Sequence, residues 1–446
     1  MQHFTPNQSS VQDKKLNIAV VGSGISGLSA AWLLSSKHNV TVYEASNYLG
    51  GHSNTVDVMC GDQKITVDTG FIVYNEPAYP NLTQLFNELS VETYPTEMSF
   101  AVSVDNGKLE YAGNGLERLF AQKKNLFNLG FWRMLKDIKR FYAQAPIDAR
   151  LDQEITLGDY LSNKNYSEFF YENHLYPMAA AIWSMPASKV KDYPFASFVN
   201  FCVNHGLLQI GNRPIWRTVK GGSREYVSKI SERFINRVEL NNPVITIKRY
   251  EGSVEIKSKN NTKKYDHVVL SCHADQALSL LENPSESEKA ILGSFKYSKN
   301  YTVLHHDTSI MPKDKKVWSS WNYLSAEQGL SAQLTVTYWM NRLQKLDTSS
   351  SIFVTLNPVK PPKKEKIYRE FIYHHPIFDT DAIIAQKKLW SLQGNQKTWF
   401  CGSYHGFGFH EDGLQSGLAV AEKLAGTKRP WRISGESNRI ILSDQE

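Results

Sequence analysis

The sequence predicts an α/β fold: a Rossmann-type nucleotide-binding domain with a discontinuous α+β domain beside it. A β-branched apolar run, Leu16–Val21, leads into a glycine-rich turn and then into a helical pattern. A second strand pattern near residue 400 also leads through a glycine-rich turn into a helix rich in small residues. Between these lie aromatic-rich segments with strand alternation, and 446 residues are enough for two or three domains.

Composition excludes several other classes of protein. With 41% hydrophobic and 21% charged residues the chain is typical of globular proteins, and no window holds eighteen uninterrupted apolar residues. Residues 1–15 are polar and lack the apolar core of a secretory signal, and the four cysteines are scattered without metal-ligand spacing. We therefore expect a cytoplasmic protein with reduced thiols and no metal. The net charge of +6 permits contact with acidic surfaces, but no nucleic-acid-binding signature is present.

The first glycine-rich turn is typical of a dinucleotide diphosphate site. It comprises Gly22, Ser23, Gly24, Ile25, Ser26 and Gly27. Gly22 permits the tight turn, Gly24 lets the diphosphate approach backbone amides, and Gly27 lets the helix pack on the strand. The next strand pattern ends in Glu44, which is followed by Ala45. An acidic side chain at this distance accepts hydrogen bonds from an adenosine ribose and disfavours a 2′-phosphate.

The segment after Glu44 indicates FAD rather than NAD. Gly50 and Gly51 give a second close approach of backbone to the cofactor, and His52 follows them. This pattern resembles the FAD-dependent superfamily of amine oxidases and phytoene-type desaturases, which usually ends the segment in Gly-Gly-Arg. Here His52 replaces the arginine, so a diphosphate-binding arginine is not carried over.

Further segments resemble the same superfamily along most of the chain. Residues 67–70 resemble the strand that passes beneath the flavin, which implies that Thr69 and Gly70 contact it. Residues 220–223 resemble a Gly-Gly turn that opens a helix. Three expected strands (242–248, 253–257 and 265–271) resemble a meander whose Val244 holds the adenine, although a plain three-stranded sheet is the alternative. The closing motif implies flavin contacts by Gly402, Asp412, Gly413 and Leu414.

These motifs divide the chain into discontinuous domains. The FAD-binding domain is expected at 14–115, 215–295 and 395–426. The substrate domain is expected at 116–214 and 296–394, and residues 1–13 and 427–446 are expected to be tails.

One helical pattern in the substrate domain is strongly basic. Between Arg118 and Arg140 the sequence has seven Lys or Arg residues and one acid, Asp137. The pattern has two interpretations, which it fits equally well. One is an amphipathic helix with a solvated basic face, and the other is an interfacial helix held by anionic lipid headgroups.

The second part of the substrate domain reads as an antiparallel sheet with few charges. Its strand patterns place Val303, Leu304, Trp321, Leu334 and Trp339 near the substrate, which suits an apolar molecule better than a polyamine. The candidate proton-handling residues near the flavin are His305, Tyr338, Tyr404 and His405.

A narrower resemblance concerns predicted NAD/FAD-binding oxidoreductases related to the amino-terminal module of plant cyclopropane fatty acid synthases. It rests on residues 183–185, residues 409–413 and the strand patterns above. It implies a desaturase or oxidase of unsaturated, methyl-branched or cyclopropane acyl chains, with a lipid methyltransferase or cyclopropane synthase as partner. The protein is then expected on the anionic inner face of the membrane. A flavin amine oxidase acting on a small amine and a redox-neutral isomerase or FAD-binding partner are the alternatives.

Overall fold

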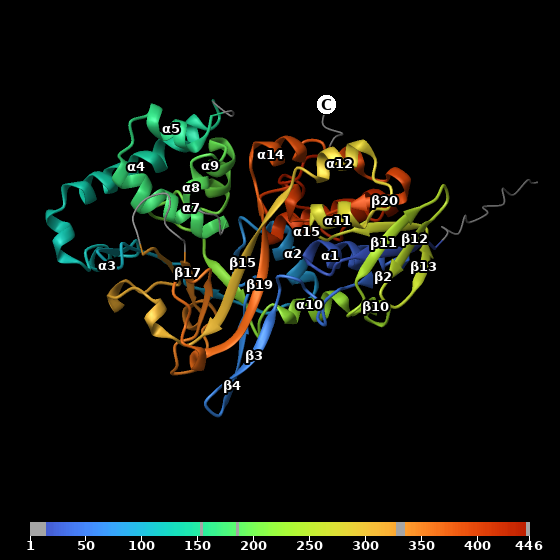
Figure 1. Ribbon diagram of the computed structural model, residues 1–446, viewed down its shortest axis with the longest axis horizontal. Coiled ribbons are helices and arrows are strands. Elements are labelled where there is room, and N and C mark those ends of the chain that lie inside the picture. The colour runs from blue at the N-terminus through green and yellow to red at the C-terminus, as the bar shows by residue number, and fades with distance from the viewer. Residues whose placement is uncertain (1–14, 152–154, 184–186, 327–334, 443–446) are drawn as a thin grey trace, which may run out of the picture.

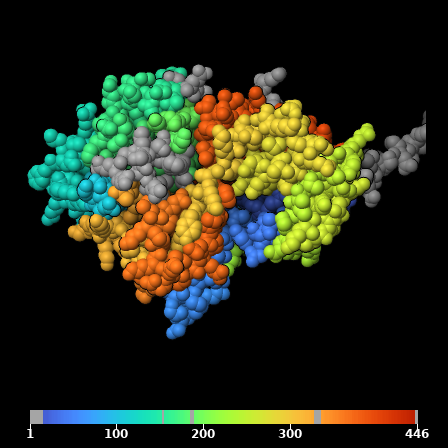
Figure 2. Space-filling model, in the orientation of Figure 1, coloured from blue at the N-terminus to red at the C-terminus, as the bar shows by residue number. Residues whose placement is uncertain are grey.

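The structure is a computed structural model that describes residues 15–151, 155–183, 187–326 and 335–442. Two lobes lie side by side (Figure 1), and the same division is seen in the space-filling view (Figure 2). One lobe is built on a parallel sheet, and the other on a mixed sheet with a helical layer above it. Within the described residues no helix combines the length and the apolar character that crossing a membrane requires.

The first lobe contains a five-stranded parallel sheet. Its order is β10 (Val238–Glu239), β2 (Asn39–Tyr43), β1 (Asn17–Val21), β14 (His267–Leu270) and β20 (Thr398–Phe400). Helices α1 (Ile25–Leu34) and α15 (His410–Ala425) pack against each other on this sheet. They approach closely because Gly417 has no side chain: an added Cβ atom there would overlap the carbonyl oxygen of Ser26. The small residues of the second glycine-rich segment therefore serve helix packing.

A three-stranded antiparallel meander covers one edge of this lobe. It consists of β11 (Val244–Arg249), β12 (Val254–Ser258) and β13 (Thr262–Tyr265). The third predicted strand, 265–271, instead forms β14 and pairs in parallel with β1. The prediction merged two short strands, because the apolar run His267–Leu270 belongs to the buried sheet and the polar run before it belongs to the meander. Helices α11 (Ala274–Leu280) and α12 (Glu286–Leu292) follow.

The second lobe contains a seven-stranded sheet. Its order is β19 (Ile367–Ile377), β15 (Lys296–His305), β18 (Phe353–Leu356), β17 (Thr335–Trp339), β16 (Trp321–Leu324), β7 (Phe100–Val104) and β8 (Leu109–Ala112). The expected antiparallel strands are present, but β7 and β8 come from before residue 115: β7 pairs in parallel with β16, and β8 pairs with β7. The domain boundary therefore differs from the expected one, because this pairing places residues 100–112 in the seven-stranded sheet.

The helical layer of the second lobe begins where the basic pattern lies. It comprises α3 (Leu116–Leu119), η1 (Lys123–Phe127), α4 (Leu129–Asp148), α5 (Leu157–Asn163), α6 (Glu168–Phe170), the π-helix η2 (Tyr171–Leu175), α7 (Tyr176–Trp183), α8 (Ala187–Val190) and α9 (Phe195–Asn204). The basic pattern is thus divided among three elements. The side chain of Asn128 accepts a hydrogen bond from Phe131 N at 3.2 Å, which starts α4 at that point.

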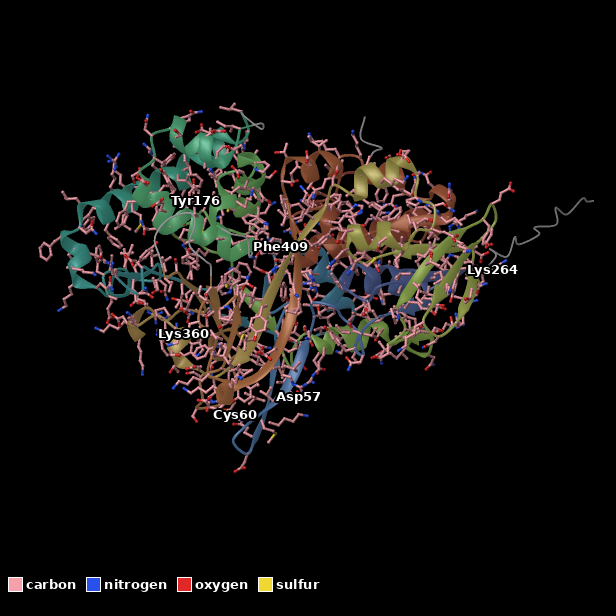
Figure 3. The ribbon with its side chains drawn as sticks, in the orientation of Figure 1. Asp57, Cys60, Tyr176, Lys264, Lys360 and Phe409 are labelled. Carbon is pink, nitrogen blue, oxygen red and sulfur yellow. The ribbon has the colours of Figure 1, made fainter. Side chains whose placement is uncertain are left out.

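The remaining elements of the described residues are short. They are β3 (Thr55–Cys60), β4 (Gln63–Asp68), β5 (Tyr74–Asn75), α2 (Pro80–Glu88), β6 (Thr93–Thr96), β9 (Trp216–Val219), α10 (Arg224–Ser231), η3 (Ile235–Arg237), η4 (Thr308–Ile310), η5 (Lys315–Val317), α13 (Met340–Leu343), η6 (Lys364–Lys366), α14 (Thr380–Gln386), η7 (Leu389–Leu392), η8 (Asn395–Lys397) and η9 (Ser403–His405). The β3–β4 hairpin, which carries Asp57 and Cys60, projects from the body of the molecule (Figure 3).

The segment after α15 is packed against the first lobe and does not form the expected tail. Trp431 stacks on Trp32 of α1 with 5.9 Å between ring centroids. Arg429 is buried and donates hydrogen bonds to Glu422 and to Asn81 Oδ1. The polar composition of 427–446 hid these anchors, because a few buried side chains suffice to order a short segment.

We predict that Trp431→Ala lowers the free energy of unfolding by about 3 kcal/mol, because a large buried aromatic side chain is removed. Ile441→Ala is the matched control: its side chain is exposed, and we expect a change within about 0.5 kcal/mol. Chemical denaturation of both variants checks the result, and equal effects would contradict the packing described.

Candidate functional site

A cavity of about 790 Å³ extends from the first glycine-rich turn to the helical layer of the second lobe. Figure 2 shows the N-terminal segment at the bottom of a hollow between the meander and the α11–α12 region. Both lobes contribute to the lining, which includes strands β15 to β19 only at a few positions. The cavity therefore joins the predicted nucleotide site to the predicted substrate side.

The glycine-rich turn lines one end of the cavity. Gly22 has φ +100°, a conformation that side chains rarely adopt. A Cβ atom at Gly27 would overlap the carbonyl oxygen of Gly22, so this glycine allows α1 to pack on β1. At Gly24 an added Cβ would meet no protein atom within 4 Å, although Gly24 lines the cavity. The space above Gly24 is therefore left open for something other than protein.

Glu44 lies at the same end of the cavity. Its carboxylate accepts hydrogen bonds from Ser23 N at 3.0 Å, from Ser23 Oγ at 2.6 Å and from Ser46 N at 2.8 Å. Ala45 and Val244 line the cavity beside it. This arrangement fixes the carboxylate at the carboxyl end of β2, where a ribose would lie in this fold.

The segment 67–70 is held by a buried carboxylate. Asp68 accepts hydrogen bonds from Ser223 N at 2.9 Å and from Gln344 Nε2 at 2.8 Å, and burial raises the pKa of Asp68 to about 6. The next two residues, Thr69 and Gly70, line the cavity. Asp68 thus ties both lobes together directly beside the lining.

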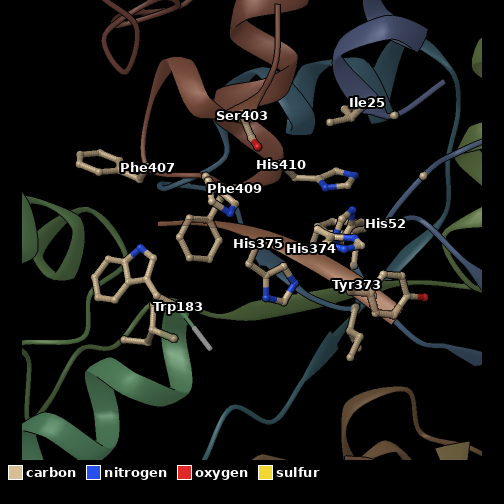
Figure 4. Close-up of a pocket in the computed structure, with 18 of the residues that line it drawn as sticks. Ile25, His52, Trp183, Tyr373, His374, His375, Ser403, Phe407, Phe409 and His410 are labelled. Carbon is tan, nitrogen blue, oxygen red and sulfur yellow. The ribbon is translucent and has the colours of Figure 1, made fainter. Parts of the chain in front are cut away.

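Histidines gather in the middle of the cavity (Figure 4). His52 packs against Tyr373, at 5.0 Å between ring centroids, and against His375, at 5.4 Å. Its Nε2 atom is buried and has no hydrogen-bond partner among the described residues. Burial lowers the pKa of His52 to about 4, so the ring is neutral near pH 7 and offers one free polar nitrogen.

Two further histidines have defined hydrogen bonds. Asn300 Nδ2 donates to His375 Nδ1 at 3.2 Å, which leaves the proton of His375 on Nε2. His410 stacks on Phe71 at 3.8 Å, and its Nε2 atom lies 2.7 Å from the Tyr226 hydroxyl. Burial lowers the pKa of both histidines to about 3. These neutral rings are suited to hydrogen bonding and packing.

The far part of the cavity is aromatic. Phe201 packs against Trp183 at 4.6 Å, against Phe409 at 4.7 Å and against Phe407 at 5.8 Å. Figure 4 shows Trp183, Phe407 and Phe409 on the side of the histidines that faces the helical layer, and Figure 3 places Phe409 between the lobes. This part of the lining offers rings and alkyl groups to a ligand.

Charged groups are nearly absent from the described lining. Glu44 is its one carboxylate and Arg213 its one Lys or Arg residue. His174, in the π-helix η2, is held between two hydroxyls, with Nδ1 3.0 Å from Tyr111 and Nε2 3.3 Å from Tyr142. Burial lowers the pKa of His174 to about 4. Beyond the nucleotide end, the cavity therefore has no negative charge among the described residues.

Two of the four predicted proton-handling residues line the cavity. Tyr338 packs edge-on against Trp321 at 5.1 Å, and Tyr404 has a buried hydroxyl without a partner among the described residues. Burial raises the pKa of both phenols, so both are protonated near pH 7.

The other two candidates are corrected, because neither lines the cavity. His305 is buried inside the seven-stranded sheet, where Nε2 lies 2.7 Å from Thr355 Oγ1 and Nδ1 accepts from Asp307 N. His405 is buried behind Tyr404. Strand alternation assigned His305 to one face, but both faces of β15 are packed at this position. Of the apolar side chains expected at the substrate, Trp321 lines the cavity, Val303, Leu304 and Trp339 do not, and Leu334 lies outside the described residues.

The closing motif lies only in part along the cavity. Gly402 lines the cavity, but Asp412, Gly413 and Leu414 do not. Asp412 accepts a hydrogen bond from Phe409 N at 2.7 Å and pairs with Arg439. Glu411 accepts hydrogen bonds from Asn81 N and Leu82 N, both at 3.0 Å, so it caps α2. These carboxylates stabilise helix starts and do not face the cavity.

The sequence reasoning missed the residues of β19. Tyr373, His374 and His375 all line the cavity, together with His273. The signal was a Tyr-His-His-Pro run at the end of a strand pattern, because three adjacent rings there carry several hydrogen-bonding groups.

Comparison with known proteins identifies the family. The sequence profile of flavin containing amine oxidoreductases matches residues 25–305. The chain belongs to this family. Among curated relatives, amine oxidase [flavin-containing] B of Homo sapiens is 28% identical over 281 residues, which cover 58% of this chain and 50% of that protein. Amine oxidase [flavin-containing] A of Canis lupus familiaris is 26% identical over 261 residues, covering 57% and 49%. The chain thus spans about half the length of these relatives.

Solved structures share the fold over nearly the whole chain. A putrescine oxidase bound to putrescine has a TM-score of 0.65 at 15% identity, covering 93% of this chain and 99% of that one. A fatty acid isomerase from P. acnes that produces CLA has a TM-score of 0.66 at 14% identity, covering 93% and 98%. These similarities support the mixed α/β fold and, at such identities, show the fold alone.

FAD is the cofactor of this family, and the residues present fit it. The open space above Gly24, the fixed carboxylate of Glu44 and the free nitrogen of His52 lie along one cavity. The backbone turn and α1 would hold the diphosphate, Glu44 the adenosine ribose, and the segment 69–70 the flavin side. Gly50, Gly51 and Ser26, which were also expected at the cofactor, line the same cavity.

We predict that Gly24→Val yields folded protein with little bound FAD. An added Cβ atom meets no protein atom within 4 Å, and the valine side chain would project into the space for the diphosphate. Gly252→Val is the matched control, because Gly252 is also free of close neighbours and lies outside the cavity. Flavin content, measured from the visible spectrum after purification, checks the result; full loading of Gly24→Val would contradict the assignment.

A second prediction concerns His205, which lines the cavity with its Nε2 buried and unpartnered among the described residues. Burial lowers its pKa from 6.5 to about 3, so the unfolded chain binds a proton below pH 6.5 that the folded chain does not. This contribution to stability is complete above pH 6.5 and decreases as pH falls toward 3. When the pH is lowered from about 7 to 5, the free energy of unfolding of the wild type should fall because of this histidine. The fall should be roughly 2 kcal/mol smaller in the His205→Phe variant, which has no imidazole at this position. Denaturation at several pH values tests this, and parallel losses would disprove it.

Proposed function

We propose that the protein is a FAD-dependent oxidoreductase that acts on an acyl chain of a lipid. The observation that carries the proposal is the described lining of the cavity beyond the nucleotide end, which is mainly aromatic and aliphatic and contains no carboxylate. An acyl chain gains free energy by leaving water for such a lining, about 0.8 kcal/mol for each buried CH₂ group.

The same lining disfavours an amine. An alkylammonium ion is costly to bury unless a carboxylate or a ring of aromatic faces compensates its charge. Arg213, the one Lys or Arg residue of the described lining, would repel it, and the neutral His174 supplies no negative charge. The aromatic rings near Phe201 pack mainly against one another.

In this proposal the residues of the chain bind and orient FAD and the acyl chain. Bound FAD supplies a two-electron acceptor. Phe201, Trp183 and Phe409 would exclude water and align an acyl chain, and the Nε2–H group of His375 would be available as a hydrogen-bond donor to a ligand in the middle of the cavity. Tyr338 and Tyr404 keep their protons near pH 7 and are therefore donors, not bases.

Both kinds of relative bear on this proposal. The family name and the putrescine oxidase favour amines, whereas the fatty acid isomerase shows that this fold also takes an acyl substrate. We infer unsaturated, methyl-branched or cyclopropane acyl chains, in keeping with the resemblance to cyclopropane synthase modules. A lipid methyltransferase or cyclopropane synthase partner belongs to the same proposal.

Anaerobic titration separates these alternatives. We predict that lipids with such acyl chains bleach the flavin, whereas benzylamine and spermine do not, because the described lining offers no counter-charge to an ammonium group. Bleaching by an amine without a response to lipids would reverse the proposal. Conversion of the lipid without bleaching would indicate an isomerase instead.

Ile182 offers a sharper test, because it lines the apolar part of the cavity. We predict that Ile182→Asp raises KM for acyl lipids by tenfold or more, since a desolvated carboxylate replaces an alkyl group. Ile182→Val should keep KM within about threefold, because only one methylene is removed. Steady-state kinetics on flavin-loaded variants measure both, and equal KM values would place the substrate elsewhere.

A further inference from the structure

Large apolar side chains are exposed together at the outer edge of the helical layer. In the segment from α3 to the start of α4, Leu116 is 76% exposed, Phe127 88% and Leu129 85%. Leu126 and Trp132 of the same segment are also exposed. Figure 1 shows this segment at the rim of the second lobe. Single exposed apolar residues are common on proteins, but five within seventeen residues form a patch.

The charge around this patch is positive. Lys123, Arg133 and Lys136 are exposed, and none forms an ion pair with another described residue. Asp137 is the one acid between Arg118 and Arg140, and it is buried, accepting hydrogen bonds from Ser167 N at 3.0 Å and from its hydroxyl. Glu117, beside Leu116, is exposed, but the three exposed cations outnumber it. The exposed surface therefore combines apolar side chains with a net positive charge. Such a combination is complementary to an anionic bilayer.

One end of the cavity opens beside the patch. Gly113 and Asn114 are exposed, line the cavity and directly precede the loop to Leu116. Arg213 is likewise exposed and lines the cavity, and its electrostatic effect on both Tyr142 and His174 places it near the same end. These residues form the mouth of the cavity. Arg213 can face an anionic lipid headgroup there while the acyl chain lies inside the cavity.

A second segment of the chain brings exposed apolar residues to the same mouth. Ile210 is 71% exposed and Ile215 68%, on either side of Arg213. Strand β6 and the residue after it link this segment to the loop before α3. Trp216 pairs with Thr96 of β6, and the next residue, Glu97, accepts a hydrogen bond from Asn114 at 3.5 Å. The mouth thus has exposed apolar residues on both sides.

We propose that this mouth docks on an anionic phospholipid bilayer, so that the acyl substrate passes from the membrane into the cavity. The docking surface consists of Leu116, Leu126, Phe127, Leu129, Trp132, Ile210 and Ile215 with the cations Lys123, Arg133, Lys136 and Arg213. The delivery of substrate from the bilayer rests on the proposed lipid substrate. Binding of the protein to the bilayer depends only on the docking surface.

The experiment uses flavin-loaded protein and sedimentation with vesicles. Wild type should bind vesicles of phosphatidylcholine and phosphatidylglycerol and bind pure phosphatidylcholine vesicles less, with the difference shrinking as salt shortens the Debye length below about 8 Å. A Leu116→Ser, Phe127→Ser, Leu129→Ser variant should bind at least roughly tenfold less to either vesicle. Lys123→Gln, Arg133→Gln and Lys136→Gln should each cost roughly fivefold on anionic vesicles only.

The matched control is Ile245→Ser, which removes an apolar side chain that is 54% exposed on the meander, outside the proposed surface. It should bind vesicles as the wild type does. Flavin content and the melting temperature of every variant establish that it is folded. Unchanged vesicle binding by the triple serine variant would overturn the proposal, as would an equal loss in the control. So would a monomer–dimer shift in the triple variant without a change in vesicle binding, because the patch would then cover a second copy of the chain.

The same variants separate this proposal from the lipid activity. With lipid presented in vesicles, the triple serine variant should bleach its flavin more slowly than the wild type, whereas lipid dispersed in detergent should restore the rate. Vesicle binding without any bleaching by acyl lipids would leave the docking surface intact and reject the lipid substrate. Bleaching at equal rates from vesicles and detergent by all variants would reject the docking surface and keep the substrate.

Discussion

Close contact between backbone segments around the β1–α1 turn is the constraint on which the rest of the site depends. Gly27 lets α1 pack on the carbonyl of Gly22, and Gly417 lets α15 pack on Ser26. Ser271 at the end of β14 donates its hydroxyl to Val21 O at 2.7 Å, which fixes the turn from the other side. Because these contacts use backbone and small side chains, the space above Gly24 stays open while its walls are rigid.

The lobes are joined by polar contacts directly beside the cavity. Asp68 binds Ser223 on one side and Gln344 on the other, and Asn54 Nδ2 donates to the Tyr373 hydroxyl at 3.0 Å. The strand β19 is thereby held against the nucleotide-binding lobe, with His375 turned toward the cavity. Buried groups of this kind favour one relative placement of the lobes, since any other leaves them unsatisfied.

The apolar character of the far cavity and that of the outer patch have one physical explanation under the proposed function. An acyl chain that left a bilayer for an aqueous path would lose the free energy gained by burial of each CH₂ group. A mouth that rests on the membrane avoids this loss. Arg213 at the mouth and the uncharged lining behind it would then set the direction in which the lipid lies.

The sequence by itself determined the nucleotide half of the protein. The spacing of Gly22, Gly24, Gly27 and Glu44 acts over short distances, because a strand, a turn and a helix are adjacent in the chain, and all four residues lie where the pattern placed them. The helical and strand character of most elements was predictable for the same reason.

The tertiary structure alone decided the substrate half. His305 was a reasonable candidate from alternation, but packing against the rest of the lobe buries both faces of β15 at residues 302–305. Asp412 was expected at the flavin, but its carboxylate forms a buried ion pair with Arg439. Arg439 lies in a segment that was expected to be a tail. Conversely, His375 and Phe201 meet at one cavity from segments about 170 residues apart, and strand β7 joins a sheet made mostly of residues after 295. Local patterns specify elements, whereas the choice among distant partners is made by packing, whose free energy exists only once the whole chain has folded.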